Sequence, residues 1–388
     1  MIASQESVTS GPVLNIAFFG SSLVSAYWNG AATYYRGIIR ALHQRGHRVT
    51  FYEPDAFDRQ QHRDLADLDW ARVVVYPAAS VRQVMKTVDE AGDADVVVKA
   101  SGVGVHDALL ESAVLALRGT RQTVVFWDVD APATLARVEA DAADPFRKLI
   151  PRYDLVLTYG GGDPVVRRYL ALGACACVPV YNAVDPDTHH PAPPEARFSC
   201  DLAFLGNRLP DREARVDEFF LKAAEAMPER SFLLGGSGWE DKPLPPNVRR
   251  LGHVYTRDHN AFNCSPMAVL NISRDSMASN GFSPATRVFE AAGAGACLIT
   301  DAWEGIEEFL EPGTEVLVAH DGGEVARHLR GLDLASAAAI GDRARRRVLR
   351  EHTYAHRAEQ VEAILRGRWP ALQDRMRGPA RKQETADA

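Results

Sequence analysis

The stretch from 279 to 301 (SNGFSPATRVFEAAGAGACLITD) holds the residue types best suited to binding a phosphorylated ligand. Ser283 is a favourable N-cap and Pro284 suits a first helical position, so we expect a helix to begin there. Unpaired amides in the first turn of a helix carry partial positive charge and bind phosphates. Arg287 and Glu290 follow on one helix face, where the guanidinium could neutralise a diphosphate and the carboxylate could accept hydrogen bonds from both ribose hydroxyls. A surface ion pair between these two side chains is the alternative.

Two further arginines form a second positive element. Arg208 directly follows the apolar run at 202–206, and Arg212 comes about one helical turn later. Both guanidinium groups could reach a phosphate beyond the end of a strand. The alternative for each is a solvated charge on a loop.

Three glycine-rich turns each follow an apolar run and would let the backbone approach a ligand closely. They begin at Gly20-Ser21, at Gly160 and at Gly235. A tight connection is the simpler interpretation of each turn. None of them matches the dinucleotide-binding or P-loop patterns, which weighs against a dehydrogenase or an ATPase.

Four residues of the first half could act as acids, bases or ligands. Asp128 and Asp130 close the run WDVD and would point the same way in an extended strand, where they could form a base, a hydroxyl-binding pair or a metal site. The alternative is a helix N-cap. Lys99 ends the strand DVVVK of a neighbouring run, and His106 follows that run. Either could lie in a cleft, although His106 could equally open the next helix.

Short apolar runs that alternate with helical patterns must position these residues. The runs are rich in valine and barely alternate, as expected for strands buried on both faces of a parallel sheet. This alternation predicts α/β domains with doubly wound parallel sheets. The runs span 13–20, 47–54, 71–77, 93–102, 122–130, 153–162, 200–207, 230–238, 247–254, 267–274, 295–301 and 314–319.

A proline-rich stretch at 178–195 divides the runs into two halves of similar size. We therefore predict a first domain over 13–183, a linker over 184–197 and a second domain over 198–350. The polar, aperiodic termini, 1–12 and 371–388, are predicted to be disordered. Two domains that face each other create a cleft, which is a common place for a small-molecule site.

Composition excludes several classes of protein. The chain has 388 residues, with 44 Lys and Arg against 51 Asp and Glu, for a net charge of −7, which weighs against a dedicated nucleic-acid binder. No apolar run approaches the roughly 20 residues of a membrane helix, and the start lacks a signal-peptide pattern. Five scattered cysteines are too few for a disulfide framework. We expect a cytoplasmic protein.

Several segments resemble those of the CgeB-like glycosyltransferases, most specifically within 267–320. The resemblance extends over most of 13–360 and implies the GT-B fold, in which two Rossmann-like domains face each other across a cleft. The second domain would then bind a nucleotide-sugar donor, and the first would bind the acceptor. A last helix within 351–370 would cross back to the first domain. The segments are WDVDAPATL, NVRRLGHV, LNISRDSM, FSPATRVFEAAGAGACLITD and EEFLEPGTEVLVA.

The resemblance also implies roles for single residues. Glu290 would bind the ribose, Arg287 and the amides of 281–284 would lie near the diphosphate, and Arg208 and Arg212 would replace a phosphate clamp found in related enzymes. The base pocket would lie near Gly252 and His253. The complete predicted donor site comprises Gly20, Ser21, Arg208, Arg212, Gly252, His253, Gly281, Phe282, Ser283, Arg287 and Glu290.

One departure from the family pattern concerns the stereochemistry. Many retaining relatives carry a Glu-x7-Glu pattern, but Phe282 stands eight residues before Glu290. We still favour a retaining enzyme. An inverting enzyme would need Asp128, Asp130 or His106 as its base.

The predicted function is transfer of a sugar from a nucleotide-diphosphate sugar, with UDP-sugars favoured, to a small-molecule or glycan acceptor. No metal is expected, because arginines and helix amides would stabilise the departing diphosphate and Asp128-Val129-Asp130 lies outside the donor half. Neither a nucleic-acid partner nor an integral membrane segment is expected, and the oligomeric state is open. A nucleotide-sugar-binding protein without turnover and a nucleotide-sugar epimerase are the alternatives.

Overall fold

The computed structural model describes residues 11–367 except 28, 67 and 120. The segments predicted to be disordered, 1–12 and 371–388, lie outside the described residues apart from residues 11 and 12. The last three residues of the predicted crossing segment, 368–370, also lie outside them.

The first domain is built on a seven-stranded parallel sheet with the order β3-β2-β1-β4-β5-β6-β7. Its strands are β1 (Asn15–Phe19), β2 (Arg48–Asp55), β3 (Arg72–Pro77), β4 (Val96–Ala100), β5 (Thr123–Asp128), β6 (Leu155–Thr158) and β7 (Cys177–Pro179). Its α-helices are α1 (Ala32–Gln44), α2 (Val81–Glu90), α3 (Asp107–Ala113), α4 (Ala131–Ala140) and α5 (Gly162–Ala171). Short 3-10 helices cover Val114–Leu117, Pro145–Lys148 and Ile150–Arg152.

The second domain has a six-stranded parallel sheet with the order β10-β9-β8-β11-β12-β13. Its strands are β8 (Leu202–Leu205), β9 (Phe232–Gly235), β10 (Val248–Gly252), β11 (Ala268–Asn271), β12 (Leu298–Asp301) and β13 (Leu317–Ala319). Its helices are α6 (Glu213–Val216), a π-helix (Asp217–Leu221), α7 (Lys222–Glu225), α8 (His259–Cys264), α9 (Asp275–Asn280), α10 (Thr286–Ala294), α11 (Gly322–Gly331) and α12 (Leu334–Glu351). Further 3-10 helices cover Ala196–Phe198, Thr256–Asp258 and Ile306–Glu308.

The predicted fold class is confirmed, because both sheets are parallel and each apolar run contains one strand. Each sheet is covered by an apolar core on both faces, which explains why the strands barely alternate in hydropathy. The sequence missed β7, which lies at the start of the proline-rich stretch and ends on Pro179. A proline can end an edge strand because its missing N–H is not needed there.

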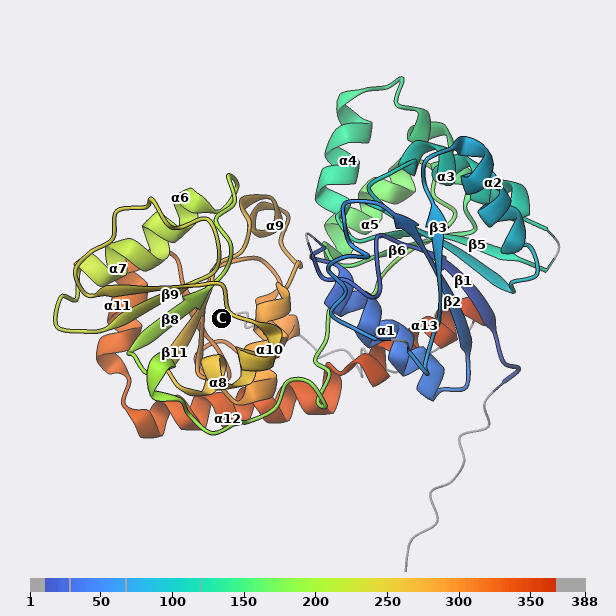
Figure 1. The fold of residues 1–388 in the computed structure, drawn as a ribbon. Coiled ribbons are helices and arrows are strands. Elements are labelled where there is room, and N and C mark those ends of the chain that lie inside the picture. The colour runs from blue at the N-terminus through green and yellow to red at the C-terminus, as the bar shows by residue number, and fades with distance from the viewer. Residues whose placement is uncertain (1–10, 28, 67, 120, 368–388) are drawn as a thin grey trace, which may run out of the picture.

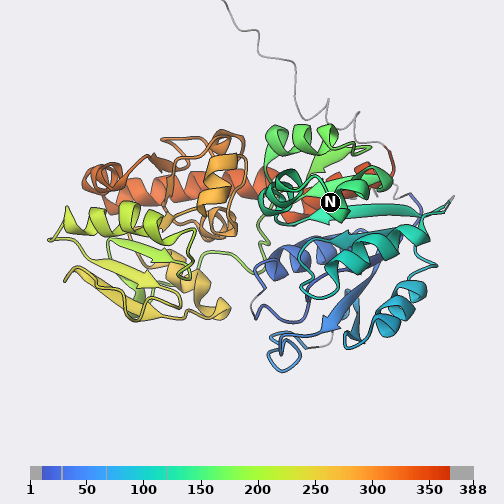
Figure 2. The ribbon, with the colours of Figure 1, turned by 90° about the horizontal axis from the view of Figure 1, so that it is seen from above.

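The chain crosses between the domains twice, and the two crossings lie side by side. Val184 of the first crossing pairs with the backbone of His352 and Tyr354, where α12 ends and α13 (Tyr354–Leu365) begins. Helix α12 runs along the second domain, and α13 continues onto the first domain, where it packs against α1 (Figures 1 and 2). Among the residues that the structure describes, no helix combines the length and apolarity needed to cross a bilayer.

Candidate active site

A cavity of about 350 Å³ lies between the two domains. The first domain contributes residues that follow β1, β2, β4, β5 and β6, and the second contributes α9 and the loop before α10. The carboxyl ends of parallel strands are where such sheets bind ligands. The cavity therefore lies where the sequence predicts a small-molecule site. Its lining includes Ser21, Asn29, Arg59, Asp130, Tyr159, Arg274 and Ser283.

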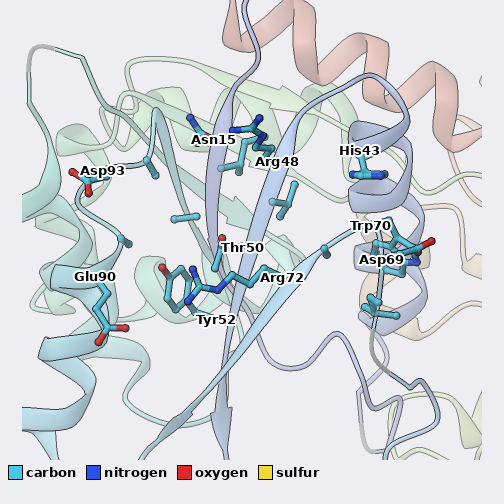
Figure 3. A pocket seen from close by; sticks show the side chains of 17 residues that line it. Asn15, His43, Arg48, Thr50, Tyr52, Asp69, Trp70, Arg72, Glu90 and Asp93 are labelled. Carbon is cyan, nitrogen blue, oxygen red and sulfur yellow. The ribbon is translucent and has the colours of Figure 1, made fainter.

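A larger hollow of about 740 Å³ lies elsewhere, at the amino ends of β1, β2 and β3 (Figure 3). Several of its charged lining residues come from separate walls, with Arg48 and Arg72 on the strands, Glu90 at the end of α2 and Asp93 just after it. None of the predicted site residues lines it. We therefore place the candidate site in the smaller cavity and in the part of the second domain beside it.

Helix α10 begins two residues later than the sequence predicts. Its N-cap is Ala285, which has no capping side chain, and the hydroxyl of Ser283 donates instead to the carbonyl of Gly281. Ser283 therefore does not cap the helix, because its hydroxyl is used in the preceding turn. The first amides of α10 keep no side-chain partner and leave a positive helix end near the cavity, on which Ser283 lies.

Arg287 and Glu290 lie inside the domain and not on its surface. Their side chains are 14% and 10% exposed, and Arg287 Nη1 lies 3.4 Å from Glu290 Oε2. Burial alone would raise the pKa of Glu290, but the charge of Arg287 holds the pKa below its usual value. Glu290 is therefore an ionised carboxylate, which accepts hydrogen bonds and donates none. Two histidines also lie beside the carboxylate.

The histidines are His189 of the linker and His259, the first residue of α8. His189 reaches Glu290, with Nε2 3.6 Å from Oε1, because the linker passes over Gly293. A Cβ on Gly293 would lie 2.5 Å from a methyl carbon of Val184, so the small residues of α10 admit the linker. Burial, followed by the charge of Arg287, lowers the pKa of His259 to about 4.

One ligand atom from each of His189, His259 and Glu290 lies within 4.8 Å of the others. Two histidines and a carboxylate form a donor set that zinc accepts. The guanidinium of Arg287 contacts the same carboxylate, however, and its positive charge opposes a cation there.

Three polar atoms around Glu290 are buried and, within the described residues, have no hydrogen-bond partner. They are His259 Nδ1, Asn263 Nδ2 and Arg287 Nε. A buried polar atom left unpaired costs about 1–3 kcal/mol, so such atoms usually have a partner. Their concentration around one ionised carboxylate is typical of a site that a polar ligand completes.

The two predicted clamp arginines differ. Arg208 is held by Glu213 at 2.7 Å and by Asp241 at 2.8 Å, so its charge is already compensated. Arg212 has no ion pair among the described residues, and burial lowers its pKa. The charges that act on Arg212 are those of Asp211, Arg274, Asp301 and Arg287.

The remaining predicted donor residues lie on loops at the carboxyl edges of the sheets. Gly252 ends β10 with φ +77°, and His253 is exposed beside it. Gly281 follows α9 with φ +66°, and Gly20 follows β1, where its amide donates to the carbonyl of Tyr52. Gly20 and Gly252 do not line the interdomain cavity.

Phe282 packs between the domains. A Cβ on Gly162 of the first domain or on Gly305 of the second would lie within 2.6 Å of its ring. The carbonyl of Phe282 accepts a hydrogen bond of 2.7 Å from the amide of Gly161. The residue at the position of the missing glutamate is thus part of the domain interface.

Asp128 and Asp130 do not form a pair. Asp128 is fully buried and accepts hydrogen bonds from Ser101, Thr134, Tyr169 and the amide of Asp130. The strand ends at Asp128, so the alternation that would align the two carboxylates stops there. Asp128 supports the loop and does not reach the cavity.

Asp130 is the one predicted acid or base that lines the cavity. It occupies the N-cap position of α4 without capping it, and its side chain is 44% exposed. Its carboxylate lies 3.6 Å from Arg274 of the second domain, which also pairs with Asp211.

The structure places Lys99 and His106 away from the cavity. Lys99 is completely buried and bonds to Asp107 at 2.8 Å. His106 precedes α3 with φ +55°, and its Nε2 lies 2.8 Å from the carbonyl oxygen of Ala78. Both are tied to the first domain, and neither contacts the cavity lining that would meet a substrate.

Sequence reasoning missed several lining residues, among them Asn29, Arg59, Tyr159 and Arg274. Asn29, Arg59 and Tyr159 stand in loops without a recognisable motif, and only the fold brings them together. Arg274 belongs to the segment LNISRDSM, which was recognised, but its sequence neighbours do not show that it faces Asp130.

Residues 212–363 match the family model described as "Glycosyl transferase-like". No curated protein matches the chain by sequence.

Solved structures similar to the chain cover both domains. HepE from Anabaena, solved with UDP and glucose, has a TM-score of 0.66 at 16% identity, and the match covers 91% of this chain and 100% of HepE. Sucrose-phosphate synthase from Thermosynechococcus elongatus has a TM-score of 0.65 at 14% identity, over 92% and 100% of the two chains. An alpha-glucosyltransferase solved with UDP and DNA has a TM-score of 0.65 at 12% identity, with the same coverage.

These comparisons do not test the CgeB-like subfamily, which stays a prediction. The chain has the GT-B fold, and its residues 212–363 match a glycosyl transferase-like family model.

Proposed function

We propose that the protein is a glycosyltransferase that uses a nucleotide-sugar donor and binds its ribose through Glu290. The observation that carries this proposal is the buried, ionised carboxylate of Glu290, surrounded by the unpaired atoms of His259, Asn263 and Arg287. The two hydroxyls of a ribose donate hydrogen bonds to a carboxylate and accept them from a guanidinium or an amide. A ribose therefore offers partners to both kinds of group.

The diphosphate of the donor would lie between Glu290 and the cavity. Arg287 stands in the first turn of α10, whose amides have no capping side chain, and its charge acts on Arg212. When the glycosyl–oxygen bond breaks, negative charge develops on the departing diphosphate. Fixed cations and amides stabilise such charge, so a metal ion is not required.

UDP-sugars are the first donors to examine. HepE has been solved with UDP-glucose, at 15% identity, and its fold is the fold of this chain. Such a likeness establishes the fold alone. The choice of UDP is therefore our proposal for the order in which donors are tested.

We favour a retaining reaction, in which the departing phosphate takes the proton of the acceptor and no protein base is needed. The competing route is inversion, for which Asp130 is the remaining candidate base on the cavity. Asp130→Asn separates the two routes. Retention predicts that turnover stays within about tenfold of wild type, whereas loss of a general base costs about 10²–10⁴-fold. The configuration of the product, read by NMR, gives an independent answer.

Donor turnover tests the proposal. Purified protein is incubated with UDP-sugars without acceptor, and the release of UDP is measured with and without EDTA. We expect release by wild type in both conditions and a loss of at least about tenfold in Glu290→Gln, because removal of one charged hydrogen-bonding partner costs about 1.5–3 kcal/mol. Glu229→Gln, an exposed residue far from α10 in the sequence, is the control and should match wild type.

Two results would count against the proposal. UDP release that is unchanged in Glu290→Gln would remove the ribose role. Dependence of the release on a metal ion would instead assign His189, His259 and Glu290 to a metal site.

A further inference from the structure

The first-domain wall of the cavity carries a buried cation that the donor does not explain. Arg59 lies in the segment after β2, is 6% exposed and lines the interdomain cavity. Its Nη1 donates to the carbonyls of Ser21 at 3.1 Å and of Val103 at 3.5 Å, and its guanidinium carbon lies 5.0 Å from the centre of the Phe57 ring. Its Nε, however, is buried without a hydrogen-bond partner in the described part of the chain. A buried polar group of this kind calls for a ligand.

No carboxylate among the described residues forms an ion pair with Arg59. Glu53 is the acidic group whose charge acts on Arg59 most directly, and burial lowers the pKa of the guanidinium despite that charge. The carboxylate of Glu53 already accepts hydrogen bonds from Ser22, the amide of Leu23 and Gln60. Its oxygens are therefore occupied by other donors.

The amino end of α1 faces the same cavity. Gly30 and Ala31 line it, and the N-cap Ala31 has no capping side chain. The 13-residue helix also has no acidic residue in its first turn. An uncapped helix of this length presents free amides and partial positive charge to an anion.

The polar side chains beside Arg59 keep this wall in place. Ser21 donates to Asn29, and Asn29 in turn donates to the carbonyls of Ser22 and Ser25. Ser21, Ser22, Ser25 and Asn29 thus hold one another in place before any ligand binds. A braced loop with free donors is preorganised for binding.

The facing wall is electrostatically different. Arg274, the cation of the second domain on the cavity, is already neutralised by Asp211 at 2.6 Å and lies 3.6 Å from Asp130. Arg59 is thus the uncompensated cation of this cavity within the described residues. The diphosphate has its own partners, Arg212 and Arg287, in the other domain.

We propose that Arg59 and the amino end of α1 bind an oxyanion carried by the acceptor, a phosphate or carboxylate group, so that the enzyme glycosylates an anionic acceptor. This inference rests on the proposed function, because it names the acceptor class for the same cavity. The cavity of about 350 Å³ is at the lower end for ligand sites, which suits a single sugar-sized acceptor.

The test is a calorimetric titration of inorganic phosphate, and separately of acetate, into the UDP-saturated protein. The variants are Arg59→Gln and, as the matched control, Arg63→Gln, which removes the same charge four residues away and does not line the cavity. We expect phosphate or acetate to bind wild type and Arg63→Gln alike, and to bind Arg59→Gln at least about tenfold more weakly. The anion that binds wild type more tightly identifies the acceptor group.

Arg59→Lys covers the case in which Arg59→Gln does not fold. Lysine keeps the charge but loses the planar fork, so binding should weaken about three- to tenfold while Arg63→Lys stays unchanged. The inference would be overturned if the Arg59 variant bound the anion as tightly as the matching Arg63 variant. It would also be overturned if wild type bound neither anion.

A third result would also overturn it. If Arg59→Gln weakens the binding of UDP but not of UMP, Arg59 holds the distal phosphate of the donor. Failure of the proposed function looks different: wild type then does not bind UDP at all. Phosphate binding by the free protein that depends on Arg59 would in that case still support the anion site.

Discussion

Glu290 keeps its charge inside the second domain because Arg287 lies beside it. Arg287 supplies the positive charge, and His189 and His259 remain neutral because they are buried next to that guanidinium. A neutral histidine can donate or accept a hydrogen bond, so the cluster offers both kinds of partner to a ligand. The cost is that these histidines resist protonation.

This cost predicts how stability depends on pH. The pKa of His259 is lowered to about 4 in the folded protein, against an unfolded value of about 6.5. The contribution of neutral His259 to the free energy of unfolding is fully present above about pH 6.5. It is lost as the pH falls below that value, because the unfolded chain binds the proton first. Between pH 6.5 and pH 5 the loss from His259 should be about 2 kcal/mol.

The measurement is urea unfolding of wild type and His259→Gln at both pH values. The variant should lose less stability on acidification, because it lacks the titrating group. His352, whose pKa is lowered to about 2, titrates in both proteins and cancels from the comparison. An equal pH dependence in the two proteins would show that His259 is not held neutral.

Arg208 and Arg212 allow a direct comparison of a compensated and an uncompensated arginine. Arg212→Gln should weaken UDP binding about ten- to hundredfold and leave uridine binding unchanged, because a hydrogen bond to a charged group contributes about 1.5–3 kcal/mol. Arg208→Gln should change neither affinity, since Glu213 and Asp241 already hold that guanidinium. Calorimetry with UDP and uridine decides the matter, and a larger effect at Arg208 would contradict the account.

Helix α13 is the element that ties the end of the chain to the first domain. Tyr354 packs so closely on α1 that a Cβ on Gly37 would lie 2.2 Å from its ring. The hydroxyl of Tyr354 donates to Asn182 beside the first crossing, so the ring cannot move freely. Gly37 therefore determines how closely α1 and α13 approach.

We expect Gly37→Ala to destabilise the protein by about 1–3 kcal/mol, as overpacking of a core does. The control is Gly331→Ala at the end of α11, where an added Cβ meets nothing within 4 Å. That variant should be neutral or slightly stabilising because alanine favours the helix. Thermal unfolding measures both, and a neutral Gly37→Ala would exclude the tight contact.

The sequence predicts most of the strands and helices. The valine-rich runs located nearly all strands, because strands buried on both faces need continuous apolar residues. The start of α10 was predicted two residues early, since the hydroxyl of Ser283 turns back to Gly281. Asp128 and Asp130 were predicted to point together, but the strand ends between them and Asp128 is taken up by four donors. Such tertiary contacts leave no local signal.

At the scale of the whole molecule, the cavity exists because the two domains are held face to face. The hydroxyls of Tyr159 and Thr286 lie 3.3 Å apart, and Arg168 Nη1 donates to Asn280 Oδ1 at 3.2 Å. Phe282 lies between glycines of both domains. The second domain carries the proposed donor-binding residues, and the cavity wall from the first domain carries Arg59. Arg59 was missed because only the folded chain brings it to Ser21 and α1.

The central claim is that the second domain binds a nucleoside diphosphate through Glu290. The most direct measurement is a thermal-shift panel of UDP, GDP, dTDP, CDP and ADP on wild type, Glu290→Gln and the control Glu229→Gln. A ligand at about 100 times its dissociation constant stabilises a protein by about 2.7 kcal/mol, which raises the midpoint by a few degrees. We predict that one diphosphate, UDP first, shifts wild type and Glu229→Gln but not Glu290→Gln; no shift of wild type by any nucleotide, or an equal shift of all three proteins, would contradict the account.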